Sequence, residues 1–411
     1  MRILVYEFVS GGGNAEDSLP SNVLSEGFSM LRGLTADFKA AGHSVATVLD
    51  SRLAAFNPPL EAECEARVTS RAASEEAFET AAKSAEAAYV IAPESGGLLR
   101  TLVEKIEKIG MGSLNCTSSA ISTAANKLIF LEHAKHLGLS TPKSLVFRVG
   151  DRIDEITESI KNELGFPAIV KPVDGVSCSG LSIVSDRRQV ERAVEKLKAT
   201  HSSEVFLAQE DVVGEAASVS LFSTDNEALP VTLNRQNISL NTPRTESSYD
   251  GGIVPSDSPS KREVFSIAKK AAKSIPGLRG YIGVDLVLTK EMPVVIEVNP
   301  RLTTSYIGLR MVSGFNPAQA LIDSALERKL PVDCETFGYS SFVKVKTRKP
   351  KKDLLFKTYG LTGVFAPPFP ISRDRSAFAM VTSHGETLQT ALSRLEKNRN
   401  TLLTTLDAKG E

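Results

Sequence analysis

The sequence has few cysteines and no long run of apolar residues. Its four cysteines, Cys64, Cys116, Cys178 and Cys334, are scattered without CxxC spacing, which indicates neither a disulfide framework nor a zinc site. No apolar stretch approaches the roughly 20 residues that span a bilayer. The first nine residues favour a short strand over a signal peptide. We therefore expect a cytoplasmic protein without a membrane partner.

An excess of charge of one sign is also missing. The chain has 48 lysines and arginines against 49 aspartates and glutamates, a formal net charge of −1. Such a balance gives no overall field that would attract nucleic acid. The one basic run, residues 344–352, is short and more typical of a solvated strand edge and loop than of a polyanion site. Small molecules are the expected partners, with a homodimer as the candidate assembly.

The first 118 residues alternate between strand and helix patterns. We predict strands over 2–9, 44–49 and 88–92, and helices over 23–41, 74–87 and 97–109. This alternation predicts a parallel, doubly wound sheet with ligands at the carboxyl ends of its strands. Gly11, Gly12 and Gly13 lie at such an end and would let backbone approach a substrate. Their spacing is not GxGxxG, so a plain flexible turn remains an equal interpretation.

Two neighbouring apolar strands carry polar side chains. Asp285 lies within the strand 281–288, and the next run, 294–301, contains Glu297, Asn299 and Arg301 at alternate positions. Alternation turns these three side chains to one face, with Ile296 and Val298 behind. If the strands are antiparallel, their oxygen ligands meet at one level and form a Mg²⁺ site. A lone acid could simply be solvated in a strand end, but two such strands favour the metal site.

Other patterns between residues 119 and 258 suggest a covered cleft. A helix is expected over 120–137. Lys171 is the one charged residue near the end of an apolar strand. A loop of small residues follows, with Ser177 and Ser179, and the backbone amides of this loop can close over phosphate oxygens. The polar segment 234–258 is long for a loop in a compact enzyme, which favours a role in covering substrate. Its Arg235, Arg244 and Tyr249 are candidate substrate contacts.

The order of these motifs over about residues 115–320 resembles the ATP-grasp superfamily of carboxylate–amine ligases. The resemblance implies that Lys127 and Lys171 hold the α- and β-phosphates of ATP. It implies that Asp285, Glu297 and Asn299 bind two Mg²⁺, for which Mn²⁺ could substitute. It also implies a set of residues around the adenine and ribose: Gln209, Glu210, Asp211, Val213 and Glu215. The chain departs from the family pattern at Asn126, often an aspartate, and at Glu215, which comes one place early.

The resemblance also implies an architecture. An N-terminal doubly wound α/β layer (1–118) would precede a two-lobed, α+β ATP-grasp fold (119–204 and 205–330) and a small C-terminal α+β segment (331–411). The segment 5–13 resembles the opening segment of one branch of the superfamily, which includes tyramine–L-glutamate ligase.

The expected activity is ATP-dependent amide formation between an amino-acid carboxylate, such as glutamate, and an amine, such as tyramine or tyrosine. An acyl phosphate would form and ADP and phosphate would be released. Arg301 and Lys171 are the candidate catalytic residues, with Arg301 beside the carboxylate. Two alternatives remain open: an ATP-grasp carboxylase or carbamoyl-type enzyme that activates bicarbonate, and a non-catalytic ATP-binding regulator.

Overall fold

The N-terminal layer is a parallel sheet with apolar residues on both faces. The computed structural model describes residues 1–175, 178–201, 203–373 and 375–407. In β1 (Arg2–Glu7), Ile3 and Val5 belong to one core with α1 (Ser21–Ala40), while Leu4 and Tyr6 face another. Alternate residues of one strand thus bury both faces, as a doubly wound sheet requires. The predicted layer is confirmed, with strand order β3-β2-β1-β4-β5. Its other elements are β2 (Ser44–Asp50), α2 (Ser51–Ala54), β3 (Glu63–Val68), α3 (Arg71–Lys83), β4 (Ala87–Ile91), η1 (Ser95–Gly97), α4 (Leu98–Ile109) and β5 (Gly112–Ser113).

The single helix expected over 120–137 is wrong, because two helices meet at Asn126. Helix α5 (Ser118–Ala125) ends there, and α6 (Lys127–His136) begins. Asn126 is extended, and its side-chain oxygen accepts hydrogen bonds from the amides of Leu128 and Ile129. An asparagine that satisfies free amides in this way starts a new helix. The break places Lys127 at the first position of α6.

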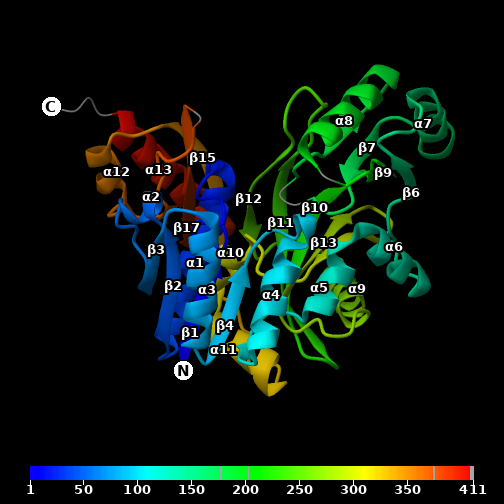
Figure 1. Ribbon diagram of the computed structural model, residues 1–411. Coiled ribbons are helices and arrows are strands. Elements are labelled where there is room, and N and C mark those ends of the chain that lie inside the picture. The colour runs from blue at the N-terminus through cyan, green and yellow to red at the C-terminus, as the bar shows by residue number, and fades with distance from the viewer. Residues whose placement is uncertain (176–177, 202, 374, 408–411) are drawn as a thin grey trace.

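The first lobe is a small antiparallel sheet with strand order β6-β9-β7-β8. Figure 1 shows it at the upper right, away from the N-terminal layer. Its own core joins residues of β7 and β9 to residues of α8. The elements are β6 (Ser144–Arg148), α7 (Ile153–Ser159), η2 (Ile160–Leu164), β7 (Ala168–Pro172), β8 (Ser182–Val184), α8 (Arg187–Thr200) and β9 (Val205–Glu210).

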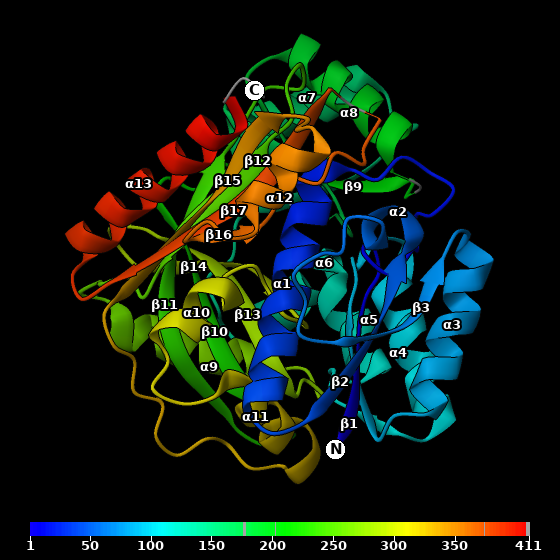
Figure 2. The same ribbon diagram turned by 90° about the vertical axis from the view of Figure 1, so that its left-hand side faces the viewer.

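The second lobe and the C-terminal segment share one antiparallel sheet, ordered β14-β13-β10-β11-β12-β15-β17-β16. Strand β15 pairs with β12, for example Phe342 with Gly252, so residues beyond 330 continue the second lobe. Figure 2 shows α13 lying across this C-terminal half of the sheet. The elements are β10 (Glu215–Ser223), β11 (Ala228–Ser239), β12 (Ser248–Val254), α9 (Lys261–Lys273), β13 (Gly280–Leu288), β14 (Pro293–Asn299), α10 (Tyr306–Val312), α11 (Pro317–Ile322), η3 (Asp323–Glu327), β15 (Tyr339–Arg348), α12 (Lys352–Thr358), β16 (Val364–Ala366), β17 (Ser376–Gly385) and α13 (Leu388–Asp407).

The long covering loop expected over 234–258 is also wrong, because most of it is the β11–β12 hairpin. The two strands pair from Arg235–Ile253 to Ser239–Ser248. Serines, asparagines and glycines hide the strand pattern in the sequence. Gly251 has φ 137° and lies so close to Phe342 that a Cβ atom would be 2.1 Å from the Phe342 carbonyl oxygen. Only glycine fits there, and the residue that looks like a loop signal is required for strand pairing.

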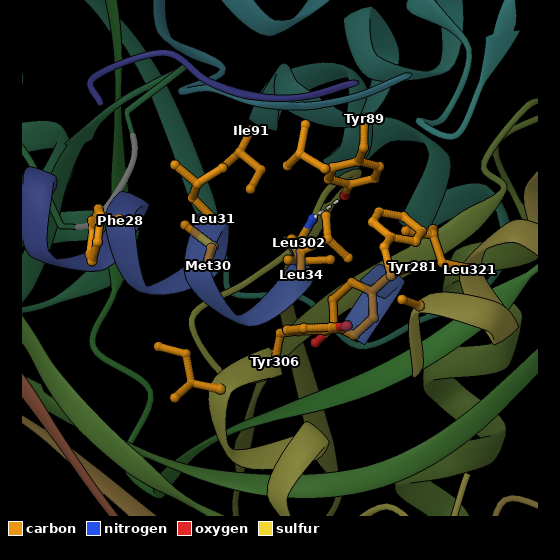
Figure 3. Packing of buried hydrophobic residues seen from close by; sticks show 14 of the residues in the cluster. Phe28, Met30, Leu31, Leu34, Tyr89, Ile91, Tyr281, Leu302, Tyr306 and Leu321 are labelled. Carbon is orange, nitrogen blue, oxygen red and sulfur yellow. Dashed lines mark hydrogen bonds between the residues drawn. The ribbon is translucent and has the colours of Figure 1, made fainter. Parts of the chain in front are cut away.

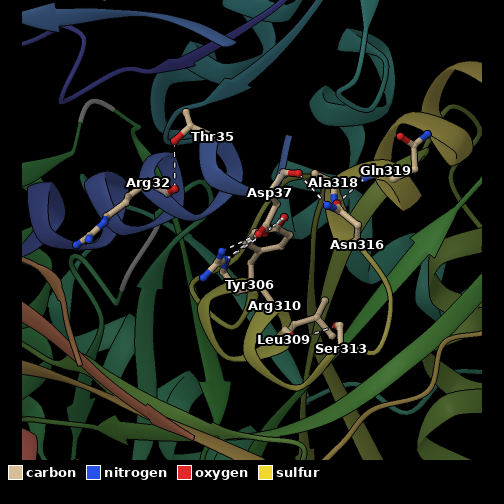
Figure 4. Close-up of polar contacts among 10 residues, drawn as sticks. All are labelled: Arg32, Thr35, Asp37, Tyr306, Leu309, Arg310, Ser313, Asn316, Ala318 and Gln319. Atoms are coloured by element: carbon tan, nitrogen blue, oxygen red, sulfur yellow. Dashed lines mark hydrogen bonds and ion pairs between the residues drawn. The ribbon is translucent and has the colours of Figure 1, made fainter. Parts of the chain in front are cut away.

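The N-terminal layer packs against the second lobe through α1. Figure 3 shows residues of α1, β4, β13, α10 and α11 in one apolar core, where the amide of Leu302 donates to the Tyr89 hydroxyl at 2.7 Å. Beside this core lies a buried polar cluster on α1, the Asp37 junction (Figure 4). The Asp37 carboxylate accepts hydrogen bonds from Tyr306 at 2.8 Å and from Arg310 at 2.7 Å. The backbone carbonyl of Asp37 accepts one from the Asn316 side chain. In the described part of the chain, no helix is long and apolar enough to cross a membrane.

We expect the Asp37→Ala substitution to lower the free energy of unfolding by about 3 kcal/mol. The change leaves the largely buried Arg310 guanidinium without its carboxylate, which costs more than losing a surface pair. Denaturant unfolding monitored by circular dichroism measures the effect. Lys39→Ala serves as the control. Lys39 lies on the same helix as Asp37 and forms an exposed ion pair with Glu61, so this substitution should lower the free energy of unfolding by less than about 1 kcal/mol. Equal losses in the two variants would contradict a structural role for the Asp37 junction.

Candidate active site

One cavity lies where the N-terminal layer and both lobes meet. Its empty volume is about 1370 Å³, including the space that opens to solvent. Its walls come from β1, α1 and β4, from β7 and the loop after it, and from β11, β13 and β14.

The predicted Mg²⁺ ligands Asp285, Glu297 and Asn299 of β13 and β14 lie together in this cavity. The strands are antiparallel, and Asp285 pairs with Glu297 while Gly283 pairs with Asn299. The amide of Asn299 donates to Asp285 at 3.0 Å, and Gln236 of β11 donates to the other carboxylate oxygen at 3.1 Å. Gln236 was not singled out from the sequence.

The register of β13 and β14 shifts between Asp285 and Leu286, and this irregularity changes the predicted alternation. Ile296 was expected behind the polar face, together with Val298. Val298 is buried as predicted, but Ile296 is half-buried and lines the same cavity as Glu297. A bulge of this kind adds one residue to a strand and breaks the strict two-residue alternation. The cavity therefore has an apolar wall directly beside its acids.

Two lysines of the first lobe balance these acids. The Lys127 ammonium lies 3.1 Å from Glu297 and donates to the carbonyl of Gly175 at 2.9 Å. Lys171 is only 4% exposed, and burial, together with the charge of Lys127, lowers its pKa to about 8. Burial works to raise the pKa of Glu297, but the charges of Lys127 and Lys171 outweigh it and lower that pKa. Burial and the neighbouring Glu297 raise the pKa of Asp285 to about 7.

The donor set fits Mg²⁺. Among the described residues no three His, Cys, Asp or Glu side chains cluster, so a third donor beside Asp285 and Glu297 has to be another oxygen, such as the Asn299 amide. Two carboxylates and an amide are hard oxygen donors, which suit Mg²⁺ better than Zn²⁺. Burial and Glu297 raise the pKa of Asp285 despite the charge of Arg301, and a divalent cation bound there would stabilise the ionised carboxylate.

Arg301 lies just beyond the end of β14 and also lines the cavity. Its Nε atom is 2.8 Å from Glu94, which is buried after β4 of the N-terminal layer. Burial opposes the charge of the guanidinium, but Glu94 outweighs it and raises the pKa of Arg301. The N-terminal layer thus holds the arginine in place at the cavity wall.

The predicted nucleotide residues lie in two places. Ser179 lines the cavity, whereas Ser177 lies outside the described residues. A second set runs from the end of β9 to the start of β10 and is absent from the cavity lining: Gln209, Glu210, Asp211, Val213 and Glu215. Within it, Gln209 donates to Ser144, the Val213 side chain is 87% exposed, and Glu215 is 3.7 Å from Arg235. Their role around the base and ribose stays a prediction.

The predicted substrate residues are mostly outside the cavity. Tyr249 lines it, but Arg235 and Arg244 do not. The glycine loop is also absent from the lining, and a Cβ atom would be 2.3 Å from Val68 at Gly12 and 2.1 Å from Phe8 at Gly13. Gly11 is equally crowded, against Tyr6. These glycines allow close packing of the turn, and the geometry offers no support for a contact with substrate.

Two acids of the N-terminal layer that the sequence analysis missed, Glu7 and Glu26, line the cavity. Glu7 is an acid in an apolar strand, and the criterion that found Asp285 would have found it. Glu26 lies 2.6 Å from Lys344, 318 residues away along the chain, and no sequence pattern predicts such a pair.

Comparisons with known proteins agree with this architecture. An ATP-grasp domain model matches residues 124–305, and a pre-ATP-grasp domain model matches residues 43–121. A tyramine–L-glutamate ligase of Methanocaldococcus fervens is 32% identical over 248 residues, which cover 60% of this chain and 69% of the ligase. The chain belongs to the ATP-grasp family. It is an ATP-dependent ligase of that family.

Solved structures share the fold over almost the whole chain. A protein assigned to the ATP-grasp superfamily from Archaeoglobus fulgidus superimposes with a TM-score of 0.62 at 21% identity, covering 93% of this chain and 99% of that one. The biotin carboxylase domain of the 2-oxoglutarate carboxylase of Hydrogenobacter thermophilus, with MgADP and bicarbonate, gives a TM-score of 0.71 at 16% identity and covers 97% and 89%. At these identities the likeness concerns the fold.

We expect Lys171→Ala to weaken binding of a Mg²⁺–ATP analogue by roughly 2 kcal/mol, because a buried ammonium would no longer face the phosphates. Calorimetric titration with a non-hydrolysable analogue measures the dissociation constant. Lys161→Ala, which removes an exposed lysine of the same lobe, is the control and should bind as the wild type does. An unchanged constant in the Lys171 variant would assign that side chain to packing.

Proposed function

We propose that this ligase joins an amino-acid carboxylate to an amine through an acyl phosphate. The observation that supports the proposal is a single cavity with three parts: the oxygen cluster of Asp285, Glu297 and Asn299, the lysines Lys127 and Lys171, and Arg301. A carboxylate does not react with an amine at neutral pH, since oxide would have to leave. Phosphorylation converts that oxygen into a leaving group.

The chemistry takes two displacements. A carboxylate oxygen attacks the γ-phosphorus of ATP, and ADP leaves. The amine nitrogen then attacks the carbonyl carbon, phosphate leaves, and the nitrogen loses a proton. When bound, Mg²⁺ supplies positive charge to the phosphates; we propose two ions at Asp285, Glu297 and Asn299. The protein mainly aligns the reactants and balances charge, a task that suits Lys127, Lys171 and Arg301.

Water has to be kept from the acyl phosphate, and the loop after β7 is positioned for this. Asp174 of that loop accepts a hydrogen bond from the amide of Gly96, and its carbonyl accepts one from Ser95, both at 2.9 Å. The contacts fasten the loop to the turn after β4 in the N-terminal layer. By these contacts Asp174 ties the first lobe to the N-terminal layer beside the cavity, which favours exclusion of water from the reaction.

Arg301 is proposed to contact the carboxylate that is activated. Its planar fork suits a carboxylate or an acyl phosphate, and Glu94 fixes its position. The relative named above acts on L-glutamate and tyramine, so glutamate with tyramine or tyrosine is the first pair to test.

We expect ADP release to require an acid and an amine together. A coupled assay would test amino acids and amines pairwise, with bicarbonate alone and each acid alone as controls, and mass spectrometry would identify the amide. ADP formation with bicarbonate alone would favour a carboxylase. Nucleotide binding without turnover across the whole panel would favour a regulator.

We expect Glu297→Gln to lower turnover at least about a hundredfold, because the neutral amide cannot balance Lys127 and a cation. The fold should be retained, as judged by circular dichroism. Glu291→Gln, which changes an exposed acid between β13 and β14, is the control and should remain active. Turnover within tenfold of wild type at saturating Mg²⁺ would rule out the metal site.

A further inference from the structure

The N-terminal layer contributes two buried carboxylates to the cavity wall that the phosphoryl chemistry does not use. Glu7 is 2% exposed at the carboxyl end of β1, and Glu26 is 5% exposed on α1. Both line the same cavity as Asp285 and Arg301. A buried carboxylate is costly unless a partner balances its charge, so each acid needs an explanation.

Hydrogen bonds from backbone amides and close packing against α1 hold the Glu7 carboxylate in position. The amides of Val9 and Ser10 donate to its two oxygens at 3.1 and 2.7 Å. On the other side, a Cβ atom at Gly27 would lie 2.5 Å from one of these oxygens. A glycine within a helix is unfavourable by roughly 0.5–1 kcal/mol relative to alanine, so α1 gives up stability where the carboxylate sits.

Among the residues that the structure describes, no cation pairs with Glu7, whereas Lys344 pairs with Glu26. Burial raises the pKa of Glu7, and only hydrogen bonds from Ser10 and Val9 oppose it. No lysine or arginine of the described ranges stands among those influences. Glu26 forms its ion pair with Lys344 of β15, which is nearly as buried. The pair is neutral as a whole, and Glu7 remains the uncompensated charge of this wall.

Apolar residues line the same cavity as these acids. They are Val23 and Met30 of α1, Ile91 and Ala92 at and just after the end of β4, and the aromatic residue Tyr249. A negative charge within apolar walls matches an organic cation with an apolar body. It matches a phosphate or a sugar poorly.

We propose that Glu7 binds the ammonium group of the amine substrate, and that this substrate is a primary amine with an apolar body and no carboxylate next to its nitrogen. The inference rests on the proposed function and identifies its nucleophile by class. An α-amino acid would bring its own carboxylate close to Glu7 and Glu26. Lys344 is already paired with Glu26, and the cavity cations Lys127, Lys171 and Arg301 are assigned to the phosphates and the activated acid. The repulsion would therefore go unrelieved and would exclude such a nucleophile.

The test compares three probes that share a phenol ring. Tyramine has the amine alone, tyrosine has the amine and a carboxylate, and 4-ethylphenol has neither. Binding to the full chain with MgADP, in a buffer without amines, would be measured by calorimetry. We expect tyramine to bind about tenfold tighter than either other probe, the factor that one charge-assisted contact provides. Equal binding of tyramine and tyrosine, equal binding of tyramine and 4-ethylphenol, or no binding of tyramine would overturn the proposal without any variant.

Two matched variants then assign the effect to Glu7. Glu7→Gln keeps an oxygen for the turn amides but loses the charge, and should reduce tyramine affinity about tenfold without changing MgADP affinity. Asp50→Asn alters an equally buried acid at the end of the neighbouring strand β2, outside the cavity lining, and should bind tyramine normally. Unchanged tyramine binding in the Glu7 variant, or a parallel loss of MgADP binding, would overturn the proposal in favour of a structural role.

Ligation assays separate this inference from the proposed function. If wild type binds tyramine through Glu7 but releases no ADP with any acid, the amine site stands and the proposed ligation fails. If wild type makes the amide and Glu7→Gln leaves the KM for the amine unchanged, ligation stands and the amine site fails.

Discussion

Two half-buried carboxylates, Asp285 and Glu297, lie opposite each other on neighbouring strands, and each raises the need for a partner that offsets its charge. Asn299 and Gln236 hold Asp285 by hydrogen bonds, and Lys127 holds Glu297 by charge. Each partner comes from a different element, since β14, β11 and α6 supply one each. Two carboxylates this close together and partly removed from water depend on such partners. The geometry of the two lobes is therefore tied to this pair, and a cation bound there would relieve the remaining strain.

The N-terminal layer completes the cavity by contacts with the segment that follows β14. Glu94 forms an ion pair with Arg301, and the Tyr89 hydroxyl accepts a hydrogen bond from the amide of the next residue, Leu302. Farther along, Asp37 binds Tyr306 and Arg310. These contacts thus fix β4 and α1 against the end of β14 and α10. Because of this attachment, Glu7 and Asp285 share one space although they are 278 residues apart in sequence.

Local patterns in the sequence were enough to predict the parallel layer, from the alternation of strands and helices, and the paired acid strands, from the alternation of side chains along a strand. They failed where a single polar side chain or a long-range contact decides the structure. Asn126 divides one helical pattern in two by capping α6. Gly251 looks like a loop residue but allows β12 to approach β15. The register shift beside Asp285 turns Ile296 toward the cavity. The Glu26–Lys344 pair joins distant elements and has no local signal.

The residues proposed for phosphoryl transfer and the acids proposed to select the amine come from different parts of the chain. The residues proposed for phosphoryl chemistry, Lys127, Lys171, Asp285, Glu297, Asn299 and Arg301, all lie within 124–305, the range that matches the ATP-grasp domain. Glu7, Glu26 and Lys344 lie outside both matched ranges. Activation of a carboxylate by ATP makes the same demands whatever the amine, whereas the nucleophile differs between enzymes. A wall supplied by β1 and α1 can therefore change its charge and shape without disturbing the acid pair, and this is the wall that we propose selects the amine.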